Sequence, residues 1–159
     1  MRVPPQDVIA AAQACQRETG ILASVTIGQW ALESAWGAKA TGRNNFFGIK
    51  AVAGQPSTMC WTHEFVGGRS IPAQQPFADY PSLEAGFAAH AHLLCGGRYV
   101  NAWGVRGNCA AFVHAIAPVY ATDPDYGDKL LSLIRTERFD TYDVRDDIGA
   151  DLTRHALEG

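Results

Sequence analysis

The segment 21–40, ILASVTIGQWALESAWGAKA, constrains the fold most, because small residues occupy most positions around the helix that it predicts. With about 100° between successive residues, its larger apolar side chains form one stripe, Ile21, Val25, Leu32 and Trp36. Alanine, serine and glycine fill much of the remaining surface, so neighbouring elements can approach closely on several sides. The pattern predicts a helix at the centre of the protein.

Turn and capping residues divide the rest of the chain into further elements. Ser82, Asn108 and Asp123 stand where helix N-caps are expected, and Pro118 is expected to end the helix that Asn108 begins. The predicted helices are 6–19, 21–40, 82–95, 109–117 and 123–137. They are enough for the core of one mainly helical (α+β) domain.

Between these helices, the signals change to short extended pieces. GIKAV at 48–52 and CWTHEFV at 60–66, followed by Gly67 and Gly68, predict a small β-hairpin or irregular lobe, and 73–82 is expected to be a loop. Alternation along the second piece places Glu64 on the face opposite Trp61.

Composition narrows the classes of partner. The chain has 159 residues, 47% hydrophobic and 18% charged, which fits one globular domain, and we expect a monomer. A net charge of -3 with scattered Lys and Arg argues against nucleic acid. No apolar run reaches the roughly 18 residues of a membrane span, so no membrane insertion is expected. Four cysteines without a CxxC pair favour free thiols, with disulfides open if the protein works outside the cytoplasm.

Glu33 is the residue whose chemistry the pattern singles out. Its neighbours on the helix face are Gln29, Trp30, Trp36 and Gly37. An isolated glutamate on a helix is more often a solvated surface residue, but tryptophan and glycine are poor partners for a solvated charge. Partial desolvation against the indole rings would raise the pKa of the carboxyl group. A glutamate so perturbed can act as a general acid near neutral pH, as the hydrophobic-pocket glutamate of lysozyme does.

Cleavage of a glycosidic bond usually takes a second carboxylate on the other side of the sugar. Glu64 is the candidate, because it lies in the predicted hairpin beside Gly67 and Gly68, where the chain can move. The alternative is an ordinary exposed strand residue, and spacing alone does not favour either.

Several stretches resemble the glucosaminidase domain of glycoside hydrolase family 73, which includes flagellar-rod hydrolases and bacterial autolysins. They follow the family's order along roughly residues 5–137: ILASVTIGQWALESAWGAKATGRNNFFGIKA, THEF, PFADYPSLEAGFAAHAHLL and YATDPDYGDKLLSLI. Ala35 and Phe46 depart mildly from the family's usual glycine and leucine. Ala78 stands where many relatives have arginine, which puts one substrate or lobe contact in doubt.

This resemblance implies a lysozyme-like fold with a small, mobile β-hairpin lobe. It implies cleavage of the β-1,4 bond after N-acetylglucosamine and before N-acetylmuramic acid in peptidoglycan glycan strands. Glu33 matches the catalytic glutamate, Glu64 the second carboxylate and Tyr126 the aromatic hydroxyl of the DPxY motif. The residues that match the glycan groove are Trp36, Asn45, Phe47 and Tyr120.

The chemistry of these side chains is compatible with the implied roles. The amide of Asn45 can bind an acetamido group, the rings of Phe47 and Trp36 can stack on sugars, and Tyr126 can donate a hydrogen bond beside a developing oxocarbenium ion. Aromatic residues at helical spacing are nevertheless more often core than groove.

Other interpretations stay open. A lytic transglycosylase or a muramidase would use a similar fold, and a non-catalytic glycan-binding domain would need no acid. Cys109 with His114, or Cys60 with His63, form only weak candidates for a cysteine peptidase. His90 and His92 point in different directions on their helix, so no metal and no cofactor is expected.

The expected division is a catalytic domain at 1–140 and a peripheral tail at 141–159. Prolines, Gln6 and Asp7 stand where a signal peptide would carry its apolar run, so no export signal is expected. Action on the cell wall in the periplasm would then follow release or delivery from the cytoplasm, as a phage endolysin or as an effector of a secretion system.

Overall fold

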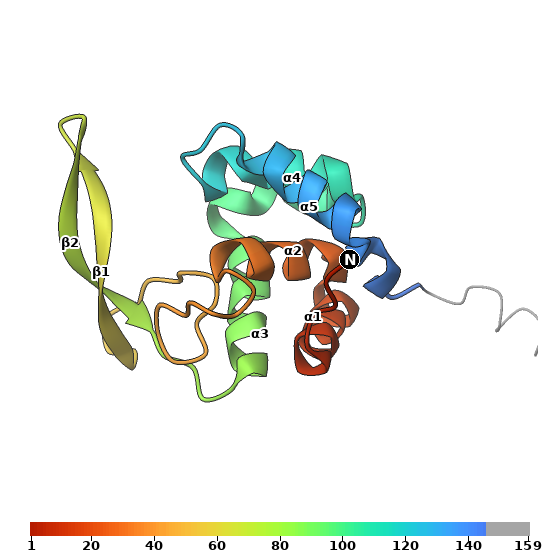
Figure 1. Ribbon diagram of the computed structural model, residues 1–159, viewed down its shortest axis with the longest axis horizontal. Helices are drawn as coiled ribbons and strands as arrows, with labels where there is room; N and C mark the ends of the chain where they lie inside the picture. The colour runs from red at the N-terminus through yellow and green to blue at the C-terminus, as the bar shows by residue number, and fades with distance from the viewer. Residues whose placement is uncertain (146–159) are drawn as a thin grey trace, which may run out of the picture.

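A computed structural model describes residues 1–145 of the chain (Figure 1). Its helical body consists of α1 (Gln6–Thr19), α2 (Ala23–Glu33), α3 (Leu83–Leu94), α4 (Cys109–Tyr120) and α5 (Tyr126–Glu137), with the 3-10 helices η1 (Gly97–Val105) and η2 (Phe139–Tyr142). The strands β1 (Ser57–Val66) and β2 (Arg69–Ala78) form a hairpin beside this body. The predicted mainly helical domain with a small β element is confirmed. None of the helices among residues 1–145 could span a membrane.

Helix α2 occupies the centre of the body, as its small residues predict. It contacts α1, α4, α5 and η2, and Figure 1 shows it crossing the middle of the molecule. The approach of α5 is closest at Gly28, where a Cβ atom would lie 2.8 Å from Leu130 Cδ1 and 2.9 Å from Ile134 Cγ1. Replacing this glycine would therefore displace the buried side chains of Leu130 and Ile134.

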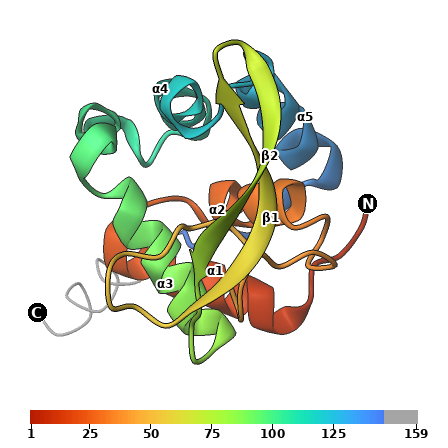
Figure 2. The same cartoon turned by 90° about the vertical axis from the view of Figure 1, so that its left-hand side faces the viewer.

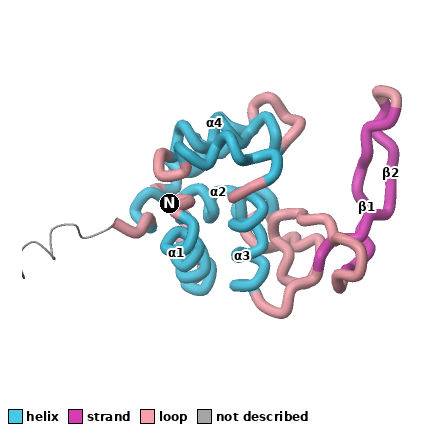
Figure 3. The backbone as a smooth tube through the Cα atoms, turned by 180° about the vertical axis from the view of Figure 1, so that it is seen from behind, coloured by secondary structure: helices cyan, strands magenta, loops and turns pink. Residues whose placement is uncertain are grey.

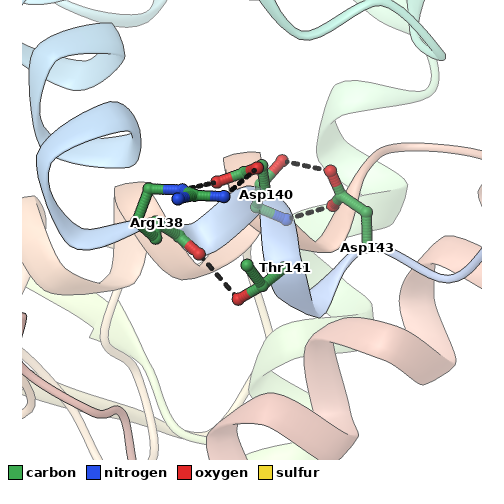
Figure 4. A network of polar contacts seen from close by, with 5 residues as sticks. Arg138, Asp140, Thr141 and Asp143 are labelled. Atoms are coloured by element: carbon green, nitrogen blue, oxygen red, sulfur yellow. Dashed lines mark hydrogen bonds and ion pairs between the residues drawn. The ribbon is translucent and has the colours of Figure 1, made fainter.

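Side chains from outside α2 satisfy the first N–H groups of the helix. The residue before it is Leu22, which cannot cap. Instead, Gln16 Oε1 accepts from the Ala23 N–H at 3.1 Å, and Asp143 Oδ1 accepts from the Ser24 N–H at 2.7 Å. Figure 4 shows Asp143 in this network, together with the Arg138–Asp140 ion pair of η2. Segments at both ends of the described chain thus fix the start of α2.

Helix α2 ends at Glu33, several residues before the predicted end at 40. The Ser34 hydroxyl donates to the Trp30 carbonyl at 2.6 Å and accepts from the Gly37 N–H at 2.8 Å. These side-chain bonds compete with the helical pattern. Ala35, Trp36 and Gly37 then adopt left-handed φ values of 49°, 62° and 84°. Glu33 consequently stands at the exposed C-terminal end of α2 rather than in its middle.

The hairpin is longer than predicted, and its second strand was expected to be a loop. β1 pairs antiparallel with β2 from Ser57↔Ala78 to Val66↔Arg69, with Gly67 and Gly68 in the turn. The expected strand at 48–52 is reduced to a short edge beside β2, where Ala51 N–H donates to the Pro76 carbonyl at 2.9 Å. Pro76 is tolerated in β2 because its backbone faces this outer edge instead of β1.

Figure 2 shows the hairpin passing in front of the helical body, and Figure 3 shows that loops alone connect it to α2 and α3. On β1, Met59, Trp61 and His63 are exposed, whereas Thr62 and Glu64 are partly covered. The predicted separation of Glu64 from Trp61 by strand alternation is confirmed.

Two helix boundaries differ from prediction. α4 continues through Pro118 to Tyr120, although Pro118 cannot donate the hydrogen bond to His114 that another residue would make, and the Ala121 N–H still donates to Ala117. α5 begins at Tyr126, since Asp123 organises the preceding turn by accepting from the Asp125 N–H at 2.9 Å. The predicted caps Ser82 and Asn108 are confirmed, each accepting from a backbone N–H of its helix.

The first residues of the expected tail pack on the body. Gln13 donates to the Tyr142 carbonyl, and Gln16 exchanges two hydrogen bonds of 2.9 Å with Val144. Phe139, just before them, is fully buried. The rest of the expected tail, 146–159, lies outside the described residues, so the domain boundary at 140 stays a prediction. All four cysteines are free thiols, and Cys15 is buried.

Candidate active site

Glu33 opens from the end of α2 onto a cleft of about 470 Å³. Phe47, Lys50, Arg98 and Tyr120 are among the other residues that line it. A larger hollow of about 1150 Å³ adjoins the cleft and shares Lys50, Arg98 and Tyr120 with it. The two hollows form one groove, with Glu33 in the smaller part and the cations at the junction.

Solvent reaches Glu33 through the cleft, but protein surrounds its carboxyl group on the other sides. The resulting desolvation raises the pKa of Glu33 above its ordinary value of 4.5, and a hydrogen bond from the Tyr126 hydroxyl offsets part of the rise. The predicted direction of the pKa shift is confirmed. Its surroundings differ from prediction, because Trp30 is buried and packs edge-on against Trp36, with ring centroids 6.0 Å apart.

Tyr126 lies beneath the cleft, in the first turn of α5. Its side chain is buried, and its ring stacks on Tyr120 with centroids 5.5 Å apart. Its hydroxyl oxygen accepts from Gln29 Nε2 at 3.1 Å, and a hydrogen bond with Glu33 is among the causes that raise the pKa of the hydroxyl. Burial raises the pKa of Tyr126, so the hydroxyl stays protonated and remains a donor. The expected position at a helix N-terminus is confirmed, but the hydroxyl contacts Glu33 and not the open groove.

Phe47 and Tyr120 line the cleft, as expected for groove residues. The Phe47 ring stacks on His90, with centroids 3.8 Å apart, and meets Phe87 edge-on at 5.0 Å. Burial lowers the pKa of His90 to about 3, so this ring is neutral under ordinary conditions. The floor of the cleft is therefore a packed, uncharged aromatic layer.

Glu64 does not line the cleft. Its Oε1 lies 3.2 Å from the Lys50 ammonium, and Lys50 lines both hollows of the groove. One ion pair thus links the hairpin to the wall of the cleft. The structure does not bring Glu64 together with Glu33, and the role of Glu64 as second carboxylate stays a prediction.

Two residues expected in the groove have other positions. Asn45 is fully buried, and its amide donates to the Ile49 and Ala78 carbonyls at 2.8 and 2.9 Å while accepting from the Ile49 N–H. It therefore has no free group for a sugar and instead joins the loop after α2 to the base of β2. Trp36 packs against Phe139, with Arg2 above its ring, and does not line the cleft.

Sequence reasoning did not identify Lys50 and Arg98. Lys50 belongs to the GIK stretch, but nothing in its spacing relates it to Glu33. Arg98 precedes Tyr99 in a glycine-rich turn and reaches the cleft only because η1 folds back beside α4. Among residues 1–145, no group of three or more His, Cys, Asp or Glu side chains could hold a metal ion.

The glucosaminidase family model, described as mannosyl-glycoprotein endo-beta-N-acetylglucosaminidase, matches residues 9–139. The chain belongs to this family. It is a glycoside hydrolase domain of family 73, and the resemblance of its motifs and its lysozyme-like fold are confirmed. The matched range includes Glu33, Glu64 and Tyr126, all of the residues expected to be catalytic.

Individual relatives agree with this membership. A probable N-acetylmuramidase of Lactococcus lactis is 33% identical over 85% of this chain, and the exo-glucosaminidase LytG of Bacillus subtilis is 33% identical over 83%. The catalytic domain of the autolysin Auto from Listeria monocytogenes aligns with a TM-score of 0.76 at 27% identity, covering 90% of this chain and 91% of that domain. The glucosaminidase domain spans only 34% of the Lactococcus protein and 50% of LytG.

Proposed function

We propose that the protein is an endo-β-N-acetylglucosaminidase that hydrolyses peptidoglycan at the β-1,4 bond between N-acetylglucosamine and N-acetylmuramic acid. The observation that carries the proposal is Glu33, a carboxyl group with a raised pKa that opens onto a groove. Family membership supports the same activity, since the matching family model is described as an endo-β-N-acetylglucosaminidase.

In this reaction, Glu33 protonates the glycosidic oxygen as the bond to the sugar breaks. Its raised pKa keeps a larger protonated fraction near neutral pH than an ordinary glutamate has. The Tyr126 hydrogen bond stabilises the carboxylate that remains after the proton has left. The aromatic residues Phe47 and Tyr120 would offer stacking surfaces to the sugar rings.

Water must then add to the sugar on the other face. We propose that Glu64 activates this water after the hairpin moves toward the groove and the ion pair with Lys50 opens. The pair is partly exposed, with side-chain accessibilities of 57% for Lys50 and 37% for Glu64, so opening it costs little.

A second candidate, lytic transglycosylation, is favoured by one observation, namely that Glu64 is not in the cleft lining. That reaction uses a single acid/base, and the muramic acid's own hydroxyl closes an anhydro ring in place of water. A muramidase is the third outcome, and the printed name of the Lactococcus relative corresponds to it.

Mass spectrometry of purified sacculi digested by the protein tests the proposal directly. After borohydride reduction, an N-acetylglucosaminidase leaves reduced N-acetylglucosamine at the new end, and a muramidase leaves reduced N-acetylmuramic acid. A transglycosylase leaves an anhydro end that does not reduce. The Glu33→Gln variant is the control, and digestion in EDTA should proceed unchanged because the proposed chemistry uses carboxylates alone. Reduced muramic acid or anhydro ends from the unaltered protein would contradict the proposal.

The expected setting, a phage endolysin or a delivered effector acting on the cell wall, stays a prediction. Lysis of cells from outside and from the periplasm by the same preparation would show which compartment gives access to the substrate.

A further inference from the structure

Gln29 is a polar side chain in an otherwise apolar part of α2. It is fully buried, and it lies one helical turn before Glu33. Its Nε2 donates to the Tyr126 hydroxyl at 3.1 Å, whereas its Oε1 has no hydrogen-bond partner among the described residues. A buried amide with an unsatisfied acceptor costs stability, so an apolar residue of the same volume would suit the core better.

The direction of each hydrogen bond in this group is determined by the available protons. Tyr126 has one hydroxyl proton, and an ionised Glu33 can only accept. The hydroxyl proton therefore goes to Glu33, and the tyrosine oxygen is left to accept from a second group. Gln29 supplies that donor, because its nitrogen faces the tyrosine oxygen.

We propose that Gln29 is a positioning residue, which acts through Tyr126 to keep the hydroxyl proton directed at Glu33. A hydrogen bond into the tyrosine oxygen prevents the hydroxyl from rotating to donate elsewhere, and it strengthens the bond that the hydroxyl donates. Glu33 then remains a stronger acid than burial alone would make it. This proposal rests on the proposed role of Glu33 as general acid.

Thr26 provides a matched comparison on the same helix. It too is buried, and its hydroxyl has no partner among residues 1–145. Unlike Gln29, Thr26 makes no hydrogen bond to Tyr126, so it has no link to Glu33 through that residue. Thr26→Val therefore tests what the loss of a buried polar group on α2 does by itself.

The experiment is a double-mutant cycle of Gln29→Met and Tyr126→Phe, followed by kcat on peptidoglycan across pH and by ¹³C NMR titration of the Glu33 carboxyl group. Gln29→Met should lower kcat by about two- to tenfold, the size of one neutral hydrogen bond. It should also move the Glu33 titration to higher pH, because the opposing hydrogen bond from Tyr126 weakens. In the Tyr126→Phe background, Gln29→Met should have no further effect on either quantity.

Additive effects of the two substitutions, or an unchanged Glu33 titration in Gln29→Met, would show that Gln29 serves only packing. Thr26→Val should leave the pH profile in place. If Gln29→Met does not fold, the proposal can be tested on the unaltered protein. The chemical shift of the Gln29 side-chain amide should change with pH in parallel with the Glu33 titration. An amide shift that does not change with this titration would overturn the proposal. Because the NMR readout needs no turnover, a protein inactive on peptidoglycan would refute the proposed function while leaving this inference testable.

Discussion

The helical body and the hairpin hold their acidic residues in different ways. Glu33 is attached to a central helix and hydrogen-bonded to Tyr126 of α5, which is itself buried. Glu64 is on a two-stranded sheet whose base pairs with the 49–51 segment, and its own side chain is held by an exposed ion pair to Lys50. The packing of the body determines the environment of Glu33, whereas the Glu64 side chain is held by an exposed contact that water can replace.

The energies of the two arrangements differ accordingly. Moving α5 relative to α2 would open the core around Gly28, where the helices are in tight contact. An exposed ion pair contributes about 1 kcal/mol or less, and a two-stranded hairpin has little stability of its own. This difference agrees with the proposed mechanism, in which Glu33 is in place in the free protein and movement of the hairpin brings Glu64 to it.

The largest effect is expected from Glu33→Gln, which preserves shape but removes the transferable proton. Lysis of purified sacculi should fall by about two orders of magnitude or more, the contribution typical of a positioned acid. Glu18→Gln, an exposed glutamate paired with His92 and outside the cleft, is the control and should be fully active. Near-normal lysis by Glu33→Gln with an intact fold would remove Glu33 from the reaction.

The same variant has a predicted effect on stability. Because the pKa of Glu33 is raised in the folded protein, the stability associated with its protonated form is present below its ordinary pKa of 4.5 and is lost as pH rises through the folded value. The glutamine side chain that replaces Glu33 cannot ionise and escapes this loss. Thermal melting should therefore show the variant to be more stable than the parent at pH 7 and equal to it well below pH 4.5.

Glu64→Gln should lower hydrolysis by about a hundredfold if its carboxylate activates water. The control is His63→Gln, which lies on the opposite face of the same strand. A measurable residual rate, with the configuration of the product retained in NMR of fresh digests, would instead indicate that the substrate's acetamido group supplies the nucleophile. Full activity of Glu64→Gln would show that Glu64 does not take part in the reaction.

Tyr126→Phe should have a smaller effect than the loss of either carboxylate. It deletes a hydrogen bond that lowers the pKa of Glu33, so the alkaline limb of the pH–rate profile should move to higher pH while kcat falls by roughly tenfold, as for a hydrogen bond to a charged group. Stability should fall by about 1–3 kcal/mol, because the buried Gln29 amide loses its hydrogen-bond partner although the ring still packs on Tyr120. A variant with an unshifted limb would show that the hydroxyl does not act on Glu33.

Lys50→Met should have the smallest effect. Unfolding in urea should reveal a loss of less than about 1 kcal/mol, since the ion pair with Glu64 is exposed. KM should rise because Lys50 lines the groove, while kcat stays close to that of the parent. A strong fall in kcat would mean that the ion pair itself holds Glu64 in its working position, contrary to the comparison of the two regions.

The central position of α2 was predictable because small residues record close packing, and Ser82 and Asn108 were predictable because capping is local. Two predictions that relied on prolines were wrong, namely the end of α4 at Pro118 and the loop around Pro76. α4 continues through Pro118 with the loss of one backbone hydrogen bond, and Pro76 faces the outer edge of β2, where the missing N–H does not interrupt pairing with β1. Both outcomes depend on neighbours that a local pattern does not contain.

Within the site, the direction of the pKa shift of Glu33 was predicted, but the tryptophans on which the prediction relied pack against each other, and the shift follows from burial of the carboxyl group. The left-handed turn after Ser34 was not predictable, and it moves Trp36 from the predicted helix face to a contact with Phe139. Asn45 illustrates a related limit, because an amide suited to an acetamido group is equally suited to two backbone carbonyls. Sequence supplies the chemical type of such residues, and tertiary contacts decide which partner they take.

The prolines of β2 also bear on how the protein behaves at high concentration. Pro76 turns its carbonyl to the outer edge of the hairpin, and Pro72, four residues earlier, has the same orientation in the alternating ladder. Ala51 already pairs with the edge at Pro76, and at Pro72 the edge lacks the N–H that an incoming strand would need. A projecting, two-stranded sheet would otherwise be a template for intermolecular β-pairing. Self-association through this edge is therefore disfavoured.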